Sequence, residues 1–180
     1  MDIVTWWFWG LLFVVLVALY LSQTAGRLDR LHIRVDRARA ALDEQLLLRA
    51  AVVSEVATSG VLDPATSLLL AEAAHEARTA APWRRSQAQS DLTDVLRLAF
   101  DDPEAVEVAR RAPGGADLLD ELASATKRVQ MASGFLDSAV RSCARVRSQR
   151  IVRWLRLAGR APWPQAESFS DEPPTALVAS

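Results

Sequence analysis

Residues 3–21 read IVTWWFWGLLFVVLVALYL, and none of these nineteen residues is Asp, Glu, Lys, Arg or His. At about 1.5 Å of rise per residue, a helix of this length matches a hydrocarbon core of about 30 Å. The run therefore predicts a transmembrane helix, with residues 1–22 as the membrane anchor. The residues expected to form the span and its aromatic interfaces are Ile3, Trp6, Trp7, Trp9, Leu12, Val15, Tyr20 and Leu21.

The flanks of the run indicate a retained anchor and set its orientation. A cleaved signal peptide has a basic n-region and a small-residue cleavage site, whereas here only Asp2 is charged before the run. A buried core helix of a soluble protein is the alternative, and the length of the uncharged run disfavours it. Arginines follow the run at once, and by the positive-inside rule they predict an inner-membrane protein with its N-terminus outside and its body in the cytoplasm. These arginines are Arg27, Arg30, Arg34, Arg37 and Arg39.

Composition bounds the remainder of the chain. The 180 residues leave room for one soluble domain after the anchor, and the formal net charge of −1 gives no overall field that favours nucleic acid. The single cysteine, Cys143, excludes an intramolecular disulfide.

Apolar residues after the anchor recur three and four positions apart, which is typical of helices that pack on one face. The first stripe predicts a long helix that leaves the membrane and ends at Ser59-Gly60. A second long helix is predicted from Asp117. The two stripes are Leu28, Leu31, Val35, Ala38, Leu42, Leu46, Val53 and Val56, and Leu118, Leu122, Ala125, Val129, Ala132, Leu136, Ala139, Cys143 and Val146.

Proline and glycine divide the middle of the chain into shorter helices. Asp63-Pro64 is an N-cap followed by proline at the first helical position, and it starts a helix through Leu68, Leu69, Ala73 and Ala77 that stops before Pro82. The next helix, over residues 84–100, is expected to bury Ala88, Leu92, Val95 and Ala99. Two arrangements remain open, because these two elements could instead form one helix kinked at Pro82. Asp101-Asp102-Pro103 restarts a short polar helix that fails at residues 112–115.

The predicted fold is therefore all-α: an N-terminal transmembrane helix that continues into an antiparallel up-down four-helix bundle with long first and last helices. The cytoplasmic bundle is assigned to residues 23–160. Residues 161–180 are rich in proline and small polar side chains, and we expect a disordered tail there.

Two stretches resemble the LemA family of bacterial membrane proteins. The family's V-x-x-A…D-x-Q-L-x-x-R pattern is similar to Val35-Asp36-Arg37-Ala38 with Leu42-Asp43-x-Gln45-Leu46-x-x-Arg49. The family's E-L…T…I…Y-N-x-A-V pattern is similar to Glu121-Leu122, Thr126, Val129, Phe135, Asp137 and Ala139-Val140. Leu136-Asp137 and Cys143-Ala144 stand where the family shows Tyr-Asn pairs. The resemblance implies a single membrane helix followed by a cytoplasmic helical bundle, and it implies no reaction.

The residues offer little for catalysis. Glu72-x-x-His75 and Asp29-x-x-His32 have the spacing of carboxylate-histidine metal sites in helical bundles, which makes a membrane-bound metalloprotein the alternative function. We expect no metal, because the last helix presents leucine and valine to the interior. Cys143 lies on an apolar stripe, where cysteine usually acts as a small hydrophobe. We therefore predict no catalytic residues, no cofactor and no enzyme activity.

The end of the last helix is strongly basic. Its arginines alternate with Ile151, Trp154 and Leu155, and a helix of this kind suits an anionic membrane surface. A solvated helix end is the alternative explanation. The predicted membrane-surface patch comprises Arg145, Arg147, Arg150, Arg153, Trp154, Arg156 and Arg160.

Taken together, these features predict a membrane-anchored scaffold or interaction protein. Its predicted partners are the lipid bilayer and unidentified proteins, with a second copy of the chain among the candidates. Nucleic acid is not expected, because one short patch on a nearly neutral protein lacks the extended basic footprint that such binding needs.

Overall fold

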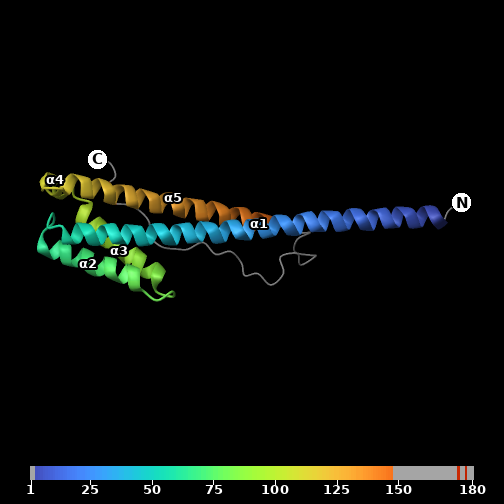
Figure 1. The fold of residues 1–180 in the computed structure, drawn as a ribbon, viewed down its shortest axis with the longest axis horizontal. Helices are drawn as coiled ribbons and strands as arrows, with labels where there is room; N and C mark the ends of the chain where they lie inside the picture. The colour runs from blue at the N-terminus through green and yellow to red at the C-terminus, as the bar shows by residue number, and fades with distance from the viewer. Residues whose placement is uncertain (1–2, 148–173, 175–176, 178–180) are drawn as a thin grey trace. The chain divides into compact units, whose positions relative to one another are not determined.

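The computed structural model describes residues 3–147, 174 and 177, although within the first and last helices the side chains of residues 3–5, 21, 24–25, 27–29 and 146–147 lie outside the description (Figure 1). All regular secondary structure in the described part of the chain is helical, which confirms the predicted all-α class. The helices are α1 (Ile3–Thr58), α2 (Pro64–Thr79), α3 (Arg85–Phe100), α4 (Pro103–Arg111) and α5 (Gly115–Arg147).

The first helix is unbroken for 56 residues and passes through Gly26 without interruption. It ends where the sequence predicts, because Gly60 adopts a φ of 77°, a left-handed conformation that suits glycine after a helix C-terminus. The Ser59 hydroxyl also donates a hydrogen bond of 2.7 Å to the Val56 carbonyl in this last turn.

Local capping explains the starts of the short helices. At α2, an Asp63 carboxylate oxygen accepts hydrogen bonds from the backbone amides of Ala65 and Thr66, at 3.0 and 3.1 Å. At α4, Asp102 caps in the same way by accepting from the Glu104 amide. Both caps are followed by proline at the first helical position, as predicted.

The two arrangements left open around Pro82 are now distinguished. The helix α2 ends at Thr79, α3 begins at Arg85, and the two pack against each other (Figure 1). A single helix kinked at Pro82 is therefore the wrong alternative.

The described residues divide into two compact units, and α1 and α5 contribute to both. Unit 1 holds residues 3–37 and 137–147, and unit 2 holds residues 38–136, 174 and 177. In unit 2, Val61 would lie 3.3 Å from a Cβ placed on Gly115, so the start of α5 adjoins the end of α1. The two long helices of this unit run in opposite directions (Figure 1).

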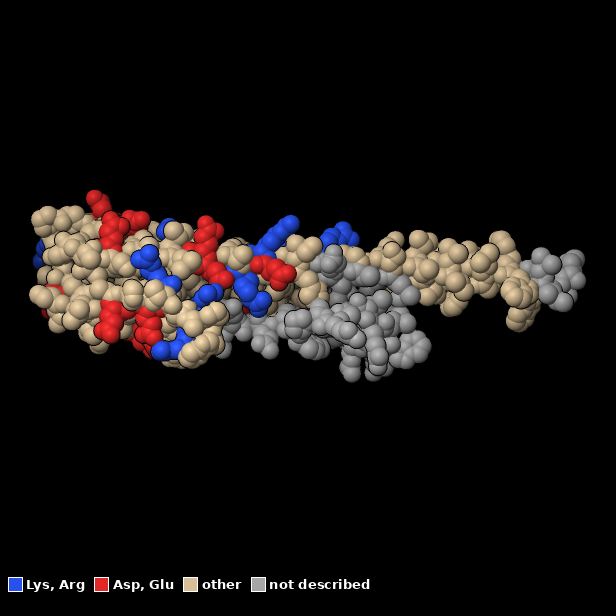
Figure 2. Space-filling model, turned by 60° about the horizontal axis from the view of Figure 1, so that its bottom comes forward, with Lys and Arg blue, Asp and Glu red and all other residues tan. Residues whose placement is uncertain are grey.

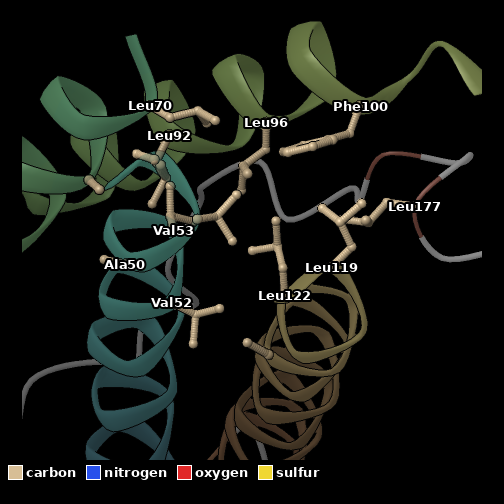
Figure 3. Packing of buried hydrophobic residues seen from close by; sticks show 14 of the residues in the cluster. Ala50, Val52, Val53, Leu70, Leu92, Leu96, Phe100, Leu119, Leu122 and Leu177 are labelled. Atoms are coloured by element: carbon tan, nitrogen blue, oxygen red, sulfur yellow. The ribbon is translucent and has the colours of Figure 1, made fainter. Parts of the chain in front are cut away.

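The core of unit 2 draws apolar side chains from all five helices. Figure 3 shows members from α1, α2, α3 and α5 packed together. Where their side chains are described, the residues of the stripes predicted on α1 and α5 are buried as expected, except that Leu31, Ala38, Leu118 and Ala132 are partly exposed. The side chains of Leu28 and Val146 lie outside the description. The fully buried members include Ala50, Val53, Leu70, Leu92, Leu96, Phe100, Leu119 and Leu122.

The helix predicted through Leu68, Leu69, Ala73 and Ala77 is α2, and its buried face begins at Leu70. Leu68 and Leu69 are exposed, whereas Leu70, Ala74 and Ala77 are buried. Three consecutive leucines allow more than one helical stripe, and the contacts with α3 select the one that begins at Leu70.

The predicted disordered tail falls mostly outside the described residues. Of residues 161–180, the structure describes Pro174 and Leu177, and both are buried. Leu177 belongs to the core cluster of unit 2. The disordered tail over residues 161–180 therefore stays a prediction.

Candidate functional site

The first third of α1 exposes apolar side chains on all sides. Every side chain from residue 6 to residue 20 is exposed, from Trp6 at 81% to Val17 at 37%. Figure 2 shows this part of α1 without a charged residue on the visible face, next to the N-terminus. Of the predicted anchor residues, Trp6, Trp7, Trp9, Leu12, Val15 and Tyr20 lie in this exposed run, whereas the side chains of Ile3 and Leu21 lie outside the description.

The described residues contain no helix that is both long enough and apolar enough to cross a membrane.

A basic face follows the apolar run on the same helix. Arg30, Arg34 and Arg37 are exposed and are spaced four and three residues apart, so they share one side of α1. They border a surface hollow together with Leu31 and Ile33. The Arg30 guanidinium also donates a hydrogen bond of 3.1 Å to the Gly26 carbonyl one turn earlier.

Most of the predicted membrane-surface patch lies beyond the described residues. Arg145 is exposed on α5, and Arg147 is the last residue of that helix, although its side chain is not described. The remaining members, Arg150, Arg153, Trp154, Arg156 and Arg160, fall outside the described residues, so the patch stays a prediction.

A buried arginine lies at the centre of unit 2. Arg49 has no exposed surface, and its Nη1 donates to the Thr93 hydroxyl at 3.1 Å. Its Nη2 donates to both the side-chain oxygen and the backbone carbonyl of Gln89, at 3.0 and 3.3 Å. The Gln89 side-chain amide in turn donates to the Ala77 carbonyl at 3.2 Å. This chain of bonds ties α1, α3 and α2 together through side-chain polar groups, and we name Arg49, Gln89 and Thr93 the polar cluster.

Other buried polar atoms in unit 2 include one on α5 and one on α1. The Thr126 hydroxyl on α5 and the side-chain oxygen of Gln45 on α1 have no hydrogen-bond partner among the described residues. Gln45 and Arg49 lie on α1, and Thr126 lies on α5. Both long helices therefore supply buried polar groups to unit 2.

Sequence reasoning missed the α3 members of the polar cluster. Gln89 and Thr93 are buried beside the predicted core residues Ala88 and Leu92, on the face of α3 that meets α1 and α2. The available signal was their spacing, because Gln89, Thr93 and Leu96 follow the same three-and-four pattern as a core stripe.

The two carboxylate-histidine pairs suggested by the sequence do not form a metal site in the described residues. Glu72 and His75 are both exposed on α2, His32 is partly buried, and the Asp29 side chain is not described. No group of three or more His, Cys, Asp or Glu side chains within the described part could hold a metal ion. Cys143 is buried on α5, as its position on the apolar stripe predicts.

Comparison with known proteins yields no match to a protein-family model, a curated protein or a solved structure.

Proposed function

We propose that this chain is a membrane-anchored helical scaffold, in which residues 3–21 of α1 lie in the bilayer and the helical body binds other proteins. The observation that carries the proposal is the uninterrupted exposure of residues 6–20, a stretch without a charged side chain. A helix that is apolar on all sides needs an apolar surrounding, either a protein core or a lipid bilayer. Because these side chains are exposed, we assign the bilayer as their surrounding.

The charges that border the run support an orientation. The exposed face of Arg30, Arg34 and Arg37 lies just beyond the apolar stretch, whereas no Lys or Arg precedes it in the sequence. Basic residues close to the end of a span favour the cytoplasmic side. We therefore propose an inner-membrane protein with its N-terminus outside and its body in the cytoplasm.

A second lipid contact is part of the proposal. Residues 137–147 of α5 belong to the same compact unit as residues 3–37, which contain the apolar run. Because α2 and α3 are two helices and not one, the chain crosses the body an even number of times. The last helix then runs back toward the end of the body at which α1 enters. We propose that the patch from Arg145 to Arg160 binds anionic headgroups, each basic residue near the surface contributing about 1 kcal/mol.

The scaffold assignment rests on the kinds of residue that the body offers. Its buried polar groups are an arginine, amides and hydroxyls that join helices, and these fix packing rather than supply acid-base chemistry. The resemblance to the LemA family agrees with an anchored bundle of this kind. We propose protein partners, including a second copy of this chain, and no catalytic activity.

Alkaline carbonate extraction of native membranes tests the anchor. The full chain is expected in the membrane pellet, together with a known single-pass protein as the control. Protease added outside intact spheroplasts should leave the arginine-bearing body uncut. Release of the chain into the carbonate supernatant, or digestion of the body from outside, would overturn the proposal.

Hydrogen–deuterium exchange of the full chain in lipid nanodiscs tests the second contact. Nanodiscs with anionic lipid should slow exchange in residues 145–160 relative to nanodiscs of neutral lipid, whereas exchange in α2 should be equal in both. Equal exchange in residues 145–160 in the two lipids would remove the contact.

A further inference from the structure

Three exposed arginines form one side of α1 just after the apolar run. Arg30, Arg34 and Arg37 are spaced four and three residues apart, and we name them the basic face. Together with Leu31 and Ile33 they line a surface hollow. All five residues belong to unit 1, which also contains the apolar run, so the basic face and the proposed anchor are parts of one compact unit.

The basic face differs from other arginines of the chain in having no carboxylate partner among the described residues. In unit 2, Arg84 pairs with Glu76 and Arg110 pairs with Asp120, at 2.7 and 2.8 Å. No ion pair of this kind within the described residues includes an arginine of the basic face. Like charges four residues apart destabilise a helix, and a bound anion would remove this repulsion.

The Arg30 side chain points back along α1 toward the apolar run. Its Nε donates a hydrogen bond of 3.1 Å to the Gly26 carbonyl, one turn closer to the N-terminus. This direction is the general one, because side chains on an α-helix lean toward its N-terminus. Gly26 lies about 7.5 Å beyond residue 21 along the helix axis. The guanidinium of Arg30 is therefore held at this height above the end of the apolar run.

This height reaches the headgroup layer of a bilayer that surrounds residues 3–21. A bilayer of about 40–45 Å contains a hydrocarbon core of about 30 Å, which leaves about 5–7.5 Å of headgroups on each side. The bond to Gly26 uses only the Nε of Arg30, so its two terminal nitrogens can donate to phosphate oxygens. Arginine suits phosphate because its planar fork presents parallel N–H groups.

We propose that the basic face is a binding site for the phosphate of an anionic phospholipid, supplied by the membrane that holds α1. The proposal deepens the proposed function and rests on its anchor. Arg30 binds the lipid phosphate directly in this arrangement. Arg34 and Arg37 lie about 6 and 10.5 Å further along the axis, and their contributions decline because charge is screened over about 8 Å.

Native mass spectrometry of the full chain tests the site. The chain is extracted in a neutral detergent and given equal amounts of phosphatidylglycerol and phosphatidylcholine with the same acyl chains. The unaltered chain should retain phosphatidylglycerol in preference to phosphatidylcholine. Arg30→Gln should lower this preference about fivefold, Arg34→Gln about twofold, and Arg37→Gln by less than about twofold. The order of these effects distinguishes a site from a general attraction between charges.

Arg128→Gln is the matched control, because Arg128 is an exposed arginine on α5 outside the basic face. It removes one positive charge, as each test variant does, and it should leave the lipid preference unchanged. All four variants should keep the helical circular dichroism of the unaltered chain, because each changes one exposed side chain. Equal losses in Arg30→Gln, Arg37→Gln and Arg128→Gln would overturn the site, and so would equal retention of the two lipids by the unaltered chain.

Inorganic phosphate distinguishes a lipid headgroup from a soluble anion as the ligand. Phosphate at millimolar concentration should not displace phosphatidylglycerol from the full chain, because the lipid is also held beside α1 by its acyl chains. Displacement of the lipid by phosphate would assign the basic face to a soluble anion and overturn the lipid as its ligand.

Carbonate extraction separates failure of the site from failure of the anchor. The Arg30→Gln chain should stay in the carbonate-resistant pellet with the unaltered chain, because residues 3–21 are the same in both. A retained chain whose lipid preference does not respond to Arg30→Gln would overturn the site and leave the anchor in place. Release of the unaltered chain would overturn the anchor and the lipid site together.

Discussion

Two stretches of α1 differ in whether they expose or bury their apolar side chains. Residues 6–20 of α1 are almost entirely apolar, and all of their side chains are exposed. Residues 38–58 mix apolar with polar and charged residues, and they supply a buried stripe with helical spacing. The stripe buries Arg49 together with Leu46 and Val53, because these residues lie three and four positions apart. Position on the helix face, more than hydrophobicity, decides burial within unit 2.

The largest expected effect is on the exposed stretch. Leu12 and Val15 lie near the middle of residues 3–21, where an arginine costs about 2.5–3.5 kcal/mol on insertion scales. The double variant Leu12→Arg/Val15→Arg should therefore lose about 5–7 kcal/mol of insertion free energy and leave the carbonate-resistant pellet. Immunoblotting of pellet and supernatant measures the loss.

The control is an exposed apolar residue on the other stretch of α1. Leu47 is 51% exposed in unit 2, and the Leu47→Arg chain should stay in the carbonate-resistant pellet. Release of both variants, or of neither, would mean that the two stretches do not differ in their surroundings as proposed.

The next effect compares two neighbouring leucines in unit 2. Leu46 is 3% exposed and Leu47 is 51% exposed, although both are leucines in the same helix turn. Leu46→Ala should lower the free energy of unfolding by about 2–5 kcal/mol through lost burial and a cavity. Leu47→Ala should change it by less than about 0.5 kcal/mol. Urea unfolding of the full chain in detergent, followed at 222 nm, distinguishes the two, and similar losses would contradict the buried stripe.

Replacing the buried arginine tests the polar cluster. Arg49→Met removes the donor to the Gln89 side-chain oxygen, while Thr93 still donates to the Gln89 carbonyl at 3.0 Å. Two buried acceptors, the Gln89 side-chain oxygen and the Thr93 hydroxyl oxygen, then lack the donor that Arg49 supplied, so we expect a loss of about 1–3 kcal/mol in the free energy of unfolding. Arg128→Met on the exposed face of α5 is the matched control and should have little effect. Increased stability of the Arg49 variant would show that the polar cluster costs more than it contributes.

The helices and their ends could be predicted from local signals. Hydrogen bonds and backbone preferences that act within a few residues set several helix ends. They start α2 at Asp63-Pro64, start α4 at Asp102-Pro103 and end α1 before Gly60. The stripes on α1 and α5 were predictable for the same reason, since a long periodic pattern leaves one choice of face. On α2, three consecutive leucines left several choices, and only tertiary contacts decided among them.

The buried groups that depend on distant contacts could not be predicted. Arg49 and Gln89 are buried because their hydrogen-bond partners come from other helices, 40 residues apart in sequence. Leu177 is buried in a cluster of helical residues, although 29 residues separate it from the last residue of α5. A composition rich in proline and small polar residues predicts disorder, and it does not indicate that Leu177 would be buried.

Two glycines sharpen the contrast between packed and exposed regions. A Cβ at Gly115 would collide with the Ala109 carbonyl oxygen, whereas a Cβ at Gly10 would meet nothing within 4 Å. Gly115→Ala should therefore lower the free energy of unfolding by about 1–3 kcal/mol, because the backbone of α4 or α5 must move. Gly10→Ala should leave both urea unfolding and carbonate retention unchanged. Equal tolerance of the two changes would contradict the close packing at the start of α5.

The smallest expected effect concerns Asp63, the N-cap of α2, which follows residues 38–58 of α1 in the chain. Hydrogen bonds from the Thr66 side chain, and from the backbone amides of Thr66 and Ala65, lower the pKa of the exposed Asp63 carboxyl below its ordinary value of 3.8. A lowered pKa in the folded state means that the ionised cap stabilises the fold above pH 3.8 and that this contribution is lost as the pH falls through the folded pKa. Asp63→Asn keeps an acceptor for the helix amides but cannot titrate. The difference in unfolding free energy between the unaltered chain and this variant should therefore shrink as the pH is lowered from neutral to strongly acidic. Because all other carboxylates are common to both chains, a difference that stays constant with pH would show that Asp63 caps α2 without help from its charge.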